Sequence, residues 1–189
     1  MTRVPSIETE RLRLREFEPR DADATRFFSD PDVMRFIPGG ARDPALHETR
    51  FAALLTKGRE HWELHGYGLW ALELKQSGAV IGHAGLQRLP DADEIEVYYL
   101  LDKPYWGRGL AAEAAKAVLA YGFTTGGLDR IVAIAMPDNG ASLRVMEKAG
   151  MRRVGPAHHY GIDCIKYELT RAGAAGGEKH PSLEPHPHG

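Results

Sequence analysis

The stretch EIEVYYLLDKPYWGRGLAAEAAKAVLAYGF, residues 94–123, places a strand pattern, a glycine-rich turn and a helix pattern in direct succession. The strand pattern ends near Leu101, and the helix pattern begins after Gly109. A glycine-rich turn between a strand and a helix leaves several backbone N–H groups unpaired, and the helix dipole adds partial positive charge there. The segment therefore predicts an anion site suited to a phosphate.

A second strand-to-helix junction follows further along the chain. The run RIVAIAM, residues 130–136, is rich in β-branched residues and predicts a buried strand. The segment from Asn139 to Ser142 follows it and opens another short helix pattern, SLRVMEKAG. Two such junctions in this order narrow the prediction from a general phosphate site to one kind of cofactor.

The composition is that of an ordinary globular protein, with 43% hydrophobic and 26% charged residues in a chain of 189. This length suits one domain that buries roughly two-thirds or more of its unfolded surface. The formal net charge of −2 provides no basic field, so we expect no nucleic-acid partner. The N-terminal region lacks a signal-type apolar run, and Glu113 and Lys116 interrupt the most apolar segment. We therefore expect a cytoplasmic protein without a membrane partner.

Strand and helix patterns alternate along the rest of the chain. Two short helix patterns broken at Pro31, and a longer one over 45–66 that ends at Gly66, come before most of the sheet. We expect strands over residues 7–17, 68–74, 79–89, 130–136 and 164–170 in addition to the one in the opening segment. The sum is a mixed α/β domain.

The C-terminal stretch from residue 172 to residue 189 is rich in glycine, proline and histidine. Such a composition buries too little to repay the entropy of ordering, so we expect a disordered tail after a single domain over 1–171. Its histidines, His180, His186 and His188, are interpreted as solvated, and we expect no metal site. The single cysteine, Cys164, excludes an internal disulfide, and we expect a buried structural thiol there.

A dinucleotide-dependent enzyme is a competing interpretation, because Gly107, Gly109 and Ala112 match the pattern GxGxxA. That pattern requires an acidic residue about twenty positions later, at the end of the next strand, to hold a ribose. Here the next strand pattern ends at Met136, and Asp138 lies beyond it. The chain also has no second mononucleotide-binding half, so we do not favour a nicotinamide cofactor.

The chain resembles the GNAT superfamily of N-acetyltransferases, and within it the Rim-type branch of ribosomal-protein N-terminal acetyltransferases. The resemblance covers most of residues 7–170 and rests on IETERLRLREFEPRDADATRFFSDPDVMRFI, EVYYLLDKPYWGRGLAAEA and PDNGASLRVMEKAGMRRVG. Trp106 replaces the Gln or Arg of the general superfamily pattern, as is familiar in the Rim branch. Tyr98 departs from the family, because a glycine is frequent at its position.

The resemblance implies an α/β (α+β) GNAT fold, with a central, mostly antiparallel mixed sheet of six to seven strands flanked by helices. Two strands would splay apart so that the pantetheine arm of acetyl-CoA lies between them. The backbone N–H groups of the turn would hold the pyrophosphate, and Gly109 lacks a side chain that would keep the diphosphate away. The cofactor-binding residues implied are Tyr99, Leu101, Trp106, Gly107, Arg108, Gly109, Leu110, Ala111, Ala112, Asn139 and Ser142.

Acetyl transfer to an amine needs a neutral amine, a polarised thioester carbonyl and a stabilised leaving thiolate. Glu96, or else Glu94, would accept the amine proton, and strand alternation puts both on one face without choosing between them. Ser142 would hydrogen-bond or protonate the thiolate, a role that the resemblance suggests. Asn139 would contact the cofactor arm and is also a favourable helix N-cap.

Three histidines are further candidates for the base or for residues near the acceptor. His83, on a strand pattern, is a rival base but is more often a satisfied strand residue. His158 and His159 are expected in a loop before the final strand, a region that borders the acceptor pocket in folds of this kind. In the helix after the turn, we expect Glu113 and Lys116 to face water.

We therefore expect an acetyl-CoA-dependent N-acetyltransferase that acts by direct attack, with no metal. The acceptor would be a primary amine of a small molecule or of a protein N-terminus, and the sequence leaves its identity open. The alternative is a non-catalytic acyl-CoA-binding regulatory module on the same fold, which would keep the turn but need no base. We expect a monomer or a homodimer.

Overall fold

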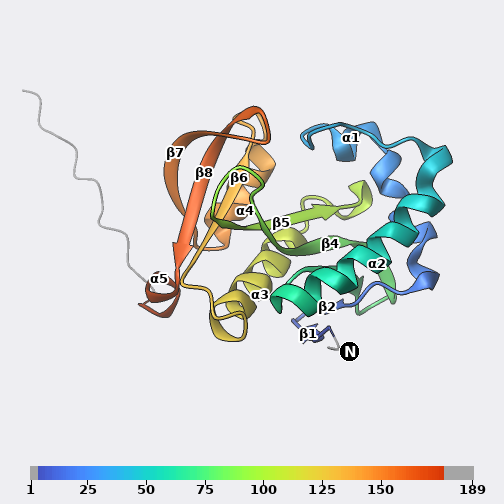
Figure 1. The fold of residues 1–189 in the computed structure, drawn as a ribbon, viewed down its shortest axis with the longest axis horizontal. Helices are drawn as coiled ribbons and strands as arrows, with labels where there is room; N and C mark the ends of the chain where they lie inside the picture. Colours follow the sequence, from blue (N-terminus) through green and yellow to red (C-terminus); the bar gives the residue numbers. More distant parts are fainter. Residues whose placement is uncertain (1–3, 177–189) are drawn as a thin grey trace, which may run out of the picture.

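A computed structural model describes residues 4–176 of the chain. An eight-stranded sheet forms its centre, with the strands in the order β1-β2-β3-β4-β5-β6-β8-β7 (Figure 1). The strands are β1 (Ile7–Glu8), β2 (Leu12–Arg15), β3 (Leu69–Leu74), β4 (Ala79–Arg88), β5 (Ile95–Leu101), β6 (Arg130–Ala135), β7 (Arg152–His159) and β8 (Ile162–Thr170). All neighbouring pairs are antiparallel except β5 and β6, which confirms the expected mostly antiparallel mixed sheet.

The α-helices are α1 (Pro31–Met34), α2 (His47–His65), α3 (Leu110–Thr124), α4 (Gly140–Lys148) and α5 (Arg171–Gly176). Four 3-10 segments add to them: η1 (Pro19–Asp21), η2 (Asp23–Ser29), η3 (Pro44–Leu46) and η4 (Lys103–Tyr105). The long helix α2 ends as the sequence predicts, because Gly66 caps it with a left-handed φ of 71°. Among residues 4–176, no helix combines the length and the apolar character needed to cross a bilayer.

The expected count of six to seven strands was too low, for two local reasons. Residues 7–17 do not form one strand, because Thr9 N–H and its hydroxyl both bond to Leu12 O and fold the chain into the β1–β2 hairpin. The segment Arg152–His159, interpreted as a loop at its end, forms β7 and pairs along its length with β8. His158 and His159 therefore lie in a strand.

The C-terminal boundary also differs from the expectation. Arg171–Gly176 form α5, so helical structure covers residues 172–176, with which the disordered tail was expected to begin. Arg171 anchors this helix, because its guanidinium donates to Leu128 O at 2.8 and 3.1 Å. The rest of the expected disordered tail, with its three histidines, lies outside the described residues.

The sheet is covered on both faces by separate apolar clusters. The largest cluster packs α3 and α4 against the sheet through buried side chains such as Leu110, Val118 and Met146. Smaller clusters around Phe28 and Phe51 belong to the N-terminal helical segments. Cys164 is buried, as expected, and its thiol donates to Ala157 O.

The β5–β6 junction is the opening in this sheet. The two strands run parallel, and their ladder contains one residue pair, Glu96 opposite Val132. β5 is meanwhile paired with β4 from Ile95 to Leu101. The carboxyl-terminal halves of β5 and β6 therefore diverge, which confirms the expected splayed strands (Figure 1).

Gly85 on β4 provides a test of this sheet. A Cβ atom built there would lie 2.4 Å from Gly68 O and 2.9 Å from Leu69 Cα, which are backbone atoms of the neighbouring chain segment. G85A should therefore lower the free energy of unfolding by about 1–3 kcal/mol, as overpacking usually does. G58A, in α2 where no heavy atom lies within 4 Å, should instead raise it by about 0.5–1 kcal/mol. Urea denaturation measures both, and a G85A protein as stable as wild type would contradict the β3–β4 packing.

Candidate active site

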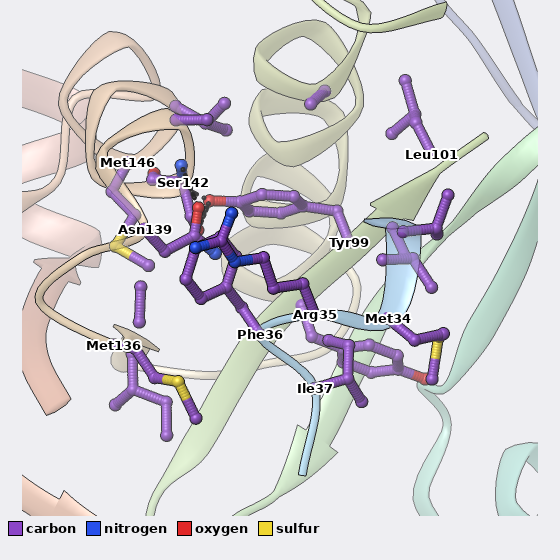
Figure 2. A pocket seen from close by; sticks show the side chains of 18 of the residues that line it. Met34, Arg35, Phe36, Ile37, Tyr99, Leu101, Met136, Asn139, Ser142 and Met146 are labelled. Atoms are coloured by element: carbon purple, nitrogen blue, oxygen red, sulfur yellow. Dashed lines mark hydrogen bonds between the residues drawn. The ribbon is translucent and has the colours of Figure 1, made fainter. Parts of the chain in front are cut away.

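A cavity of about 720 Å³ occupies the region where β5 and β6 diverge. β5, the turn before α3, the first turns of α4 and the segment after α1 all contribute to its walls. Figure 2 shows Met34–Ile37 on one side and Tyr99, Asn139 and Ser142 on the other. The volume lies within the range of small-molecule sites.

The glycine turn that lines the cavity has a left-handed backbone at both glycines. Gly107 and Gly109 adopt φ values of 72° and 77°, the left-handed region that other residues enter at a cost. Gly109 is the N-cap of α3, and Leu110, Ala111 and Ala112 form its first turn. The free N–H groups of that turn and the helix dipole make this end of the cavity suited to an anion.

The N-terminal hairpin holds this turn in place, a role that the sequence did not reveal. Glu113 accepts from the Thr9 hydroxyl at 2.6 Å and from Arg11 Nε at 2.6 Å, and Arg11 Nη1 donates to Arg108 O at 2.8 Å. The expectation that Glu113 faces water was therefore wrong. Its carboxylate joins α3 to the β1–β2 hairpin, and an acidic group in the first turn also suits the helix dipole.

Trp106 ties the turn to the end of β5. Its indole Nε1 donates to Leu101 O at 2.8 Å, while the side chain remains 46% exposed. Leu101 is among the residues expected to bind the cofactor, and its carbonyl thus already has one partner. A carbonyl oxygen accepts two hydrogen bonds, so it keeps capacity for a second.

The Tyr99 side chain bridges the gap between β5 and α4. Its hydroxyl donates to Ser142 O at 3.1 Å and lies 3.0 Å from Ser142 Oγ (Figure 2). Asn139 caps α4, as expected, by accepting from Ser142 N–H at 3.1 Å. Burial raises the pKa of Tyr99 to about 12, so the hydroxyl keeps its proton at neutral pH. From the sequence, Tyr99 was expected to bind the cofactor through its main chain. The contact of the Tyr99 hydroxyl with Ser142 was not predicted.

Glu96 is a buried carboxylate in the wall of the cavity, with an exposed fraction of 4%. Its Oε1 accepts hydrogen bonds from Gln87 Nε2 and from the Tyr160 hydroxyl. Burial raises the pKa of Glu96 above its usual value, although these two bonds act in the opposite direction. A carboxylate with a raised pKa is better matched to accepting a proton near neutral pH.

Glu94 has a different environment, although strand alternation could not separate the two residues. It lies outside the cavity wall and forms ion pairs with Arg130 and Lys166. Burial alone would raise the pKa of Glu94, but the hydrogen bonds from Lys166 and Arg130 outweigh it and lower the pKa. The geometry therefore gives Glu94 a structural role and leaves Glu96 facing the cavity.

His83 also lies in the cavity wall, where its ring stacks on Phe28 at a centroid distance of 5.3 Å. Its Nδ1 is buried and has no hydrogen-bond partner among the described residues. Burial, helped by the charge of Arg42, lowers the pKa of His83 to about 3. The ring is therefore neutral at physiological pH and is a weak proton acceptor.

The expected acceptor-side histidines do not reach the cavity wall. His158 is exposed and pairs with Asp163, and the buried His159 places its Nδ1 2.8 Å from Asp91 Oδ1. The residue of this hairpin that lines the cavity is Tyr160. No sequence signal distinguishes it from the other tyrosines.

Four basic side chains line the cavity without an ion-pair partner within 4 Å in the part of the chain that the structure describes. They are Arg35, Arg42, Arg144 and Lys148. Arg144 and Lys148 are four residues apart on α4, a spacing that puts them on one helix face and that the sequence already contained. Among the described residues, no group of three or more His, Cys, Asp or Glu could hold a metal ion.

Known proteins resemble this chain in both sequence and fold. Residues 11–152 match the family model described as an acetyltransferase (GNAT) domain. YkkB, an uncharacterized protein of Bacillus subtilis, is 36% identical over 156 residues, which cover 80% of this chain and 87% of that protein. The uncharacterized N-acetyltransferase YnaD of Bacillus subtilis is 35% identical over 150 residues, covering 79% and 84% of the two chains. The crystal structure of an acetyltransferase (GNAT family) from Bacillus anthracis superposes with a TM-score of 0.74 at 30% identity, covering 88% of this chain and 99% of that one.

The same substitution, glutamate to glutamine, should change the stability of the fold in opposite directions at Glu96 and Glu94. The folded-state pKa of Glu96 is raised, so its ionised form destabilises the fold above that pKa, and E96Q should increase stability at pH 7.5. The folded-state pKa of Glu94 is lowered, so its ion pairs stabilise the fold above the unfolded pKa of 4.5, and E94Q should lower stability at pH 7.5 by about 1 kcal/mol. Both differences should shrink as the pH falls below about 4.

Thermal melts of the two variants and wild type across pH 3–8 measure these differences. A loss of stability in E96Q at pH 7.5 would contradict the buried, raised-pKa carboxylate. E94Q serves as the matched control, because it makes the same chemical change at the neighbouring position on the same face.

Proposed function

The chain belongs to the GNAT acetyltransferase family and is an N-acetyltransferase, and on this premise we propose that it transfers the acetyl group of acetyl-CoA to a primary amine by direct attack. One observation carries the proposal. A single cavity at the β5–β6 divergence has the glycine turn at one end and the buried carboxylate of Glu96 in its wall.

The residues around the cavity fit coenzyme A by their chemistry. The N–H groups from Gly107 to Ala112 would bind the pyrophosphate, because both glycines are left-handed and no Cβ occupies the approach. Arg144 and Lys148 would add positive charge for the phosphates. The pantetheine arm would lie in the gap beside Tyr99 and Leu101, where Ala135, at the end of β6, and Met136, just after it, also line the cavity.

The two faces of β5 would divide the chemistry between them. Glu96, on the acceptor side, would remove the proton from the amine through its carboxylate. The amine nitrogen would then bond to the carbonyl carbon, polarised by a β5 backbone N–H near Val97–Tyr99, and the carbon–sulfur bond would break. Ser142 and the Tyr99 hydroxyl, on the α4 side, would hydrogen-bond the departing thiolate, which takes up a proton to leave as coenzyme A. The transfer needs no acyl-enzyme.

A non-catalytic acyl-CoA-binding module is the less favoured candidate. It would need the turn but not a buried carboxylate in the cavity, and an ionisable group that is buried without a function lowers stability. The burial of Glu96 therefore supports the enzyme.

Finer features remain proposals. The Rim-type branch is supported by Trp106 in the turn and by the N-terminal segment that precedes the sheet. The acceptor would be an amine of a small molecule or of a protein N-terminus, and the protein would act as a monomer or a homodimer. We propose residues 1–171 with the appended α5 as the single catalytic domain.

A thiol-release assay tests the proposal as a whole. Wild-type protein is incubated with acetyl-CoA and a panel of amines that includes peptides with free N-termini, polyamines and amino acids. Release of coenzyme A that depends on one class of amine supports the proposal. Binding of acetyl-CoA without release for any amine would favour the non-catalytic module.

Substitution of Gly109 separates the phosphate site from the fold. Coenzyme A should raise the Tm of wild type, because it binds the native state. G109E puts a side chain and a negative charge where the diphosphate would lie, so this increase should disappear. G127E is the matched control, because Gly127 has a similar φ of 67° at the other end of α3 and no atom within 4 Å of a Cβ. An undiminished ligand-induced shift in G109E would overturn the proposed phosphate site.

Substitution of Glu96 separates chemistry from cofactor binding. E96Q should lower turnover roughly a hundredfold to ten-thousandfold at neutral pH, the usual worth of a general base, and leave acetyl-CoA affinity nearly unchanged. High pH should partly restore the turnover of E96Q, because more of the amine is then already neutral. S142A should not recover at high pH, because its defect concerns the thiolate. E94Q should keep wild-type turnover, and pH–rate profiles with one accepted amine compare all three. Wild-type turnover in E96Q across the profile would exclude Glu96 as the base.

A further inference from the structure

Tyr160 has an unusual backbone conformation. It is the only non-glycine residue with a positive φ in the described part of the chain, at 54°, and it forms the β7–β8 turn with Gly161. A tyrosine enters the left-handed region only at a cost, because its Cβ approaches the backbone. Such outliers persist where the surrounding structure holds them, and they cluster at functional sites.

Asp91, in the loop between β4 and β5, holds this turn. Asp91 Oδ2 accepts from the Tyr160 backbone N–H at 2.9 Å, and Asp91 Oδ1 lies 2.8 Å from His159 Nδ1. His159 is buried, with an exposed fraction of 8%. One carboxylate thus fixes two consecutive residues of the hairpin and orients the Tyr160 side chain toward the sheet.

The Tyr160 hydroxyl ends at the carboxylate of Glu96. It donates to Oε1 and accepts from Gln87 Nε2 at 2.9 Å, and Gln87 Nε2 also donates to Oε1. Oε1 is therefore bound by two donors. Oε2 has no hydrogen-bond partner among the described residues. It is not fully buried either, because the fully buried side-chain atoms without a partner among these residues do not include it. Oε2 therefore keeps contact with the cavity.

We propose that Tyr160 is a positioning residue for Glu96: its hydroxyl holds Oε1 so that Oε2 faces the incoming amine, and it stabilises the ionised carboxylate. The inference rests on the proposed function, in which Glu96 is the base. One oxygen atom, Oε2 of Glu96, would be placed by three features together: the strained turn, the hydrogen bonds of Asp91 and the shared contact with Gln87.

The direction of the effect on Glu96 follows from its surroundings. Burial raises the pKa of Glu96, whereas the hydrogen bonds from Tyr160 and Gln87 lower it, as does the charge of His159. Asp91 acts weakly in the raising direction, and Tyr98 is a further titratable neighbour on β5 whose own pKa is raised by burial. Removal of the Tyr160 hydroxyl should therefore raise the pKa of Glu96 further.

The pH dependence of kcat/KM isolates this shift. Glu96 must be ionised to take the proton from the amine, so the logarithmic profile has a lower break at the pKa of Glu96, and the ionisation of the amine sets a separate upper break. In Y160F the lower break should move up by roughly one to two units, the usual worth of a hydrogen bond to a charged group. The upper break belongs to the substrate and should stay where it is. Below the lower break, kcat/KM should fall about tenfold to a hundredfold.

Y167F is the matched control. The Tyr167 hydroxyl donates to Glu147 Oε1 at 2.9 Å, so the variant also removes a hydroxyl–carboxylate bond, but Tyr167 does not line the cavity. Both breaks should match those of wild type. Y160N provides a second variant, because asparagine tolerates a left-handed φ and lacks the hydroxyl, and its lower break should move as in Y160F.

Two outcomes separate the inference from the proposed function. An unmoved lower break in Y160F and Y160N, with E96Q impaired, would overturn the role of Tyr160 and leave the base in place. If no amine is accepted, or if E96Q is fully active, the proposed function fails instead. Titration of Glu96 by 13C NMR, assigned with E96Q, then tests the inference without turnover: the pKa should rise in Y160F but not in Y167F, and equal values in Y160F and wild type would overturn it.

Discussion

The active-site region depends on the single-residue ladder between β5 and β6. Glu96 opposite Val132 is the only pair that joins these parallel strands, and both are otherwise held by antiparallel neighbours, β4 and β8. Because each strand is fixed on its outer edge, the gap between them is a permanent feature and does not have to be opened by a ligand. Backbone N–H and C=O groups that have no strand partner in this gap cost free energy unless another molecule forms hydrogen bonds with them.

The alternation of β5 then sorts side chains into two compartments. Val97, Tyr99 and Leu101 join the cluster under α3 and α4, whereas Leu100 packs against the Phe27–Phe28 cluster. The Glu96 side chain points to the same face of β5 as Leu100, because residues two or four positions apart in a strand point the same way. The Glu96 carboxylate and the Tyr99–Ser142 hydroxyl pair thus lie on opposite faces of one strand, and the gap between the strands connects the two sides.

Local signals in the sequence predicted what depends on short-range chemistry. The left-handed glycines, the Asn139 cap and the turn before α3 follow from backbone rules that act within a few residues, and the mixed sheet follows from strand patterning. Long-range partners could not be predicted. Glu94 and Glu96 are equivalent by periodicity, and only Arg130 and Lys166, brought near by β6 and β8, distinguish them. The Arg11–Glu113 pair joins residues 102 positions apart, and the contact between Tyr160 and Glu96 requires the β7–β8 turn to fold over the cavity.

The position of Trp106 also gives the protein an internal optical probe. Its indole is 46% exposed at the glycine turn, whereas Trp62 and Trp70 are 2% and 0% exposed and lie in the core with their rings 4.6 Å apart. Aqueous quenchers therefore reach one of the three tryptophans far more readily than the others, so emission near the glycine turn can be separated from emission of the core. Occupancy of the turn and integrity of the fold are reported by different fluorophores of the same unlabelled chain.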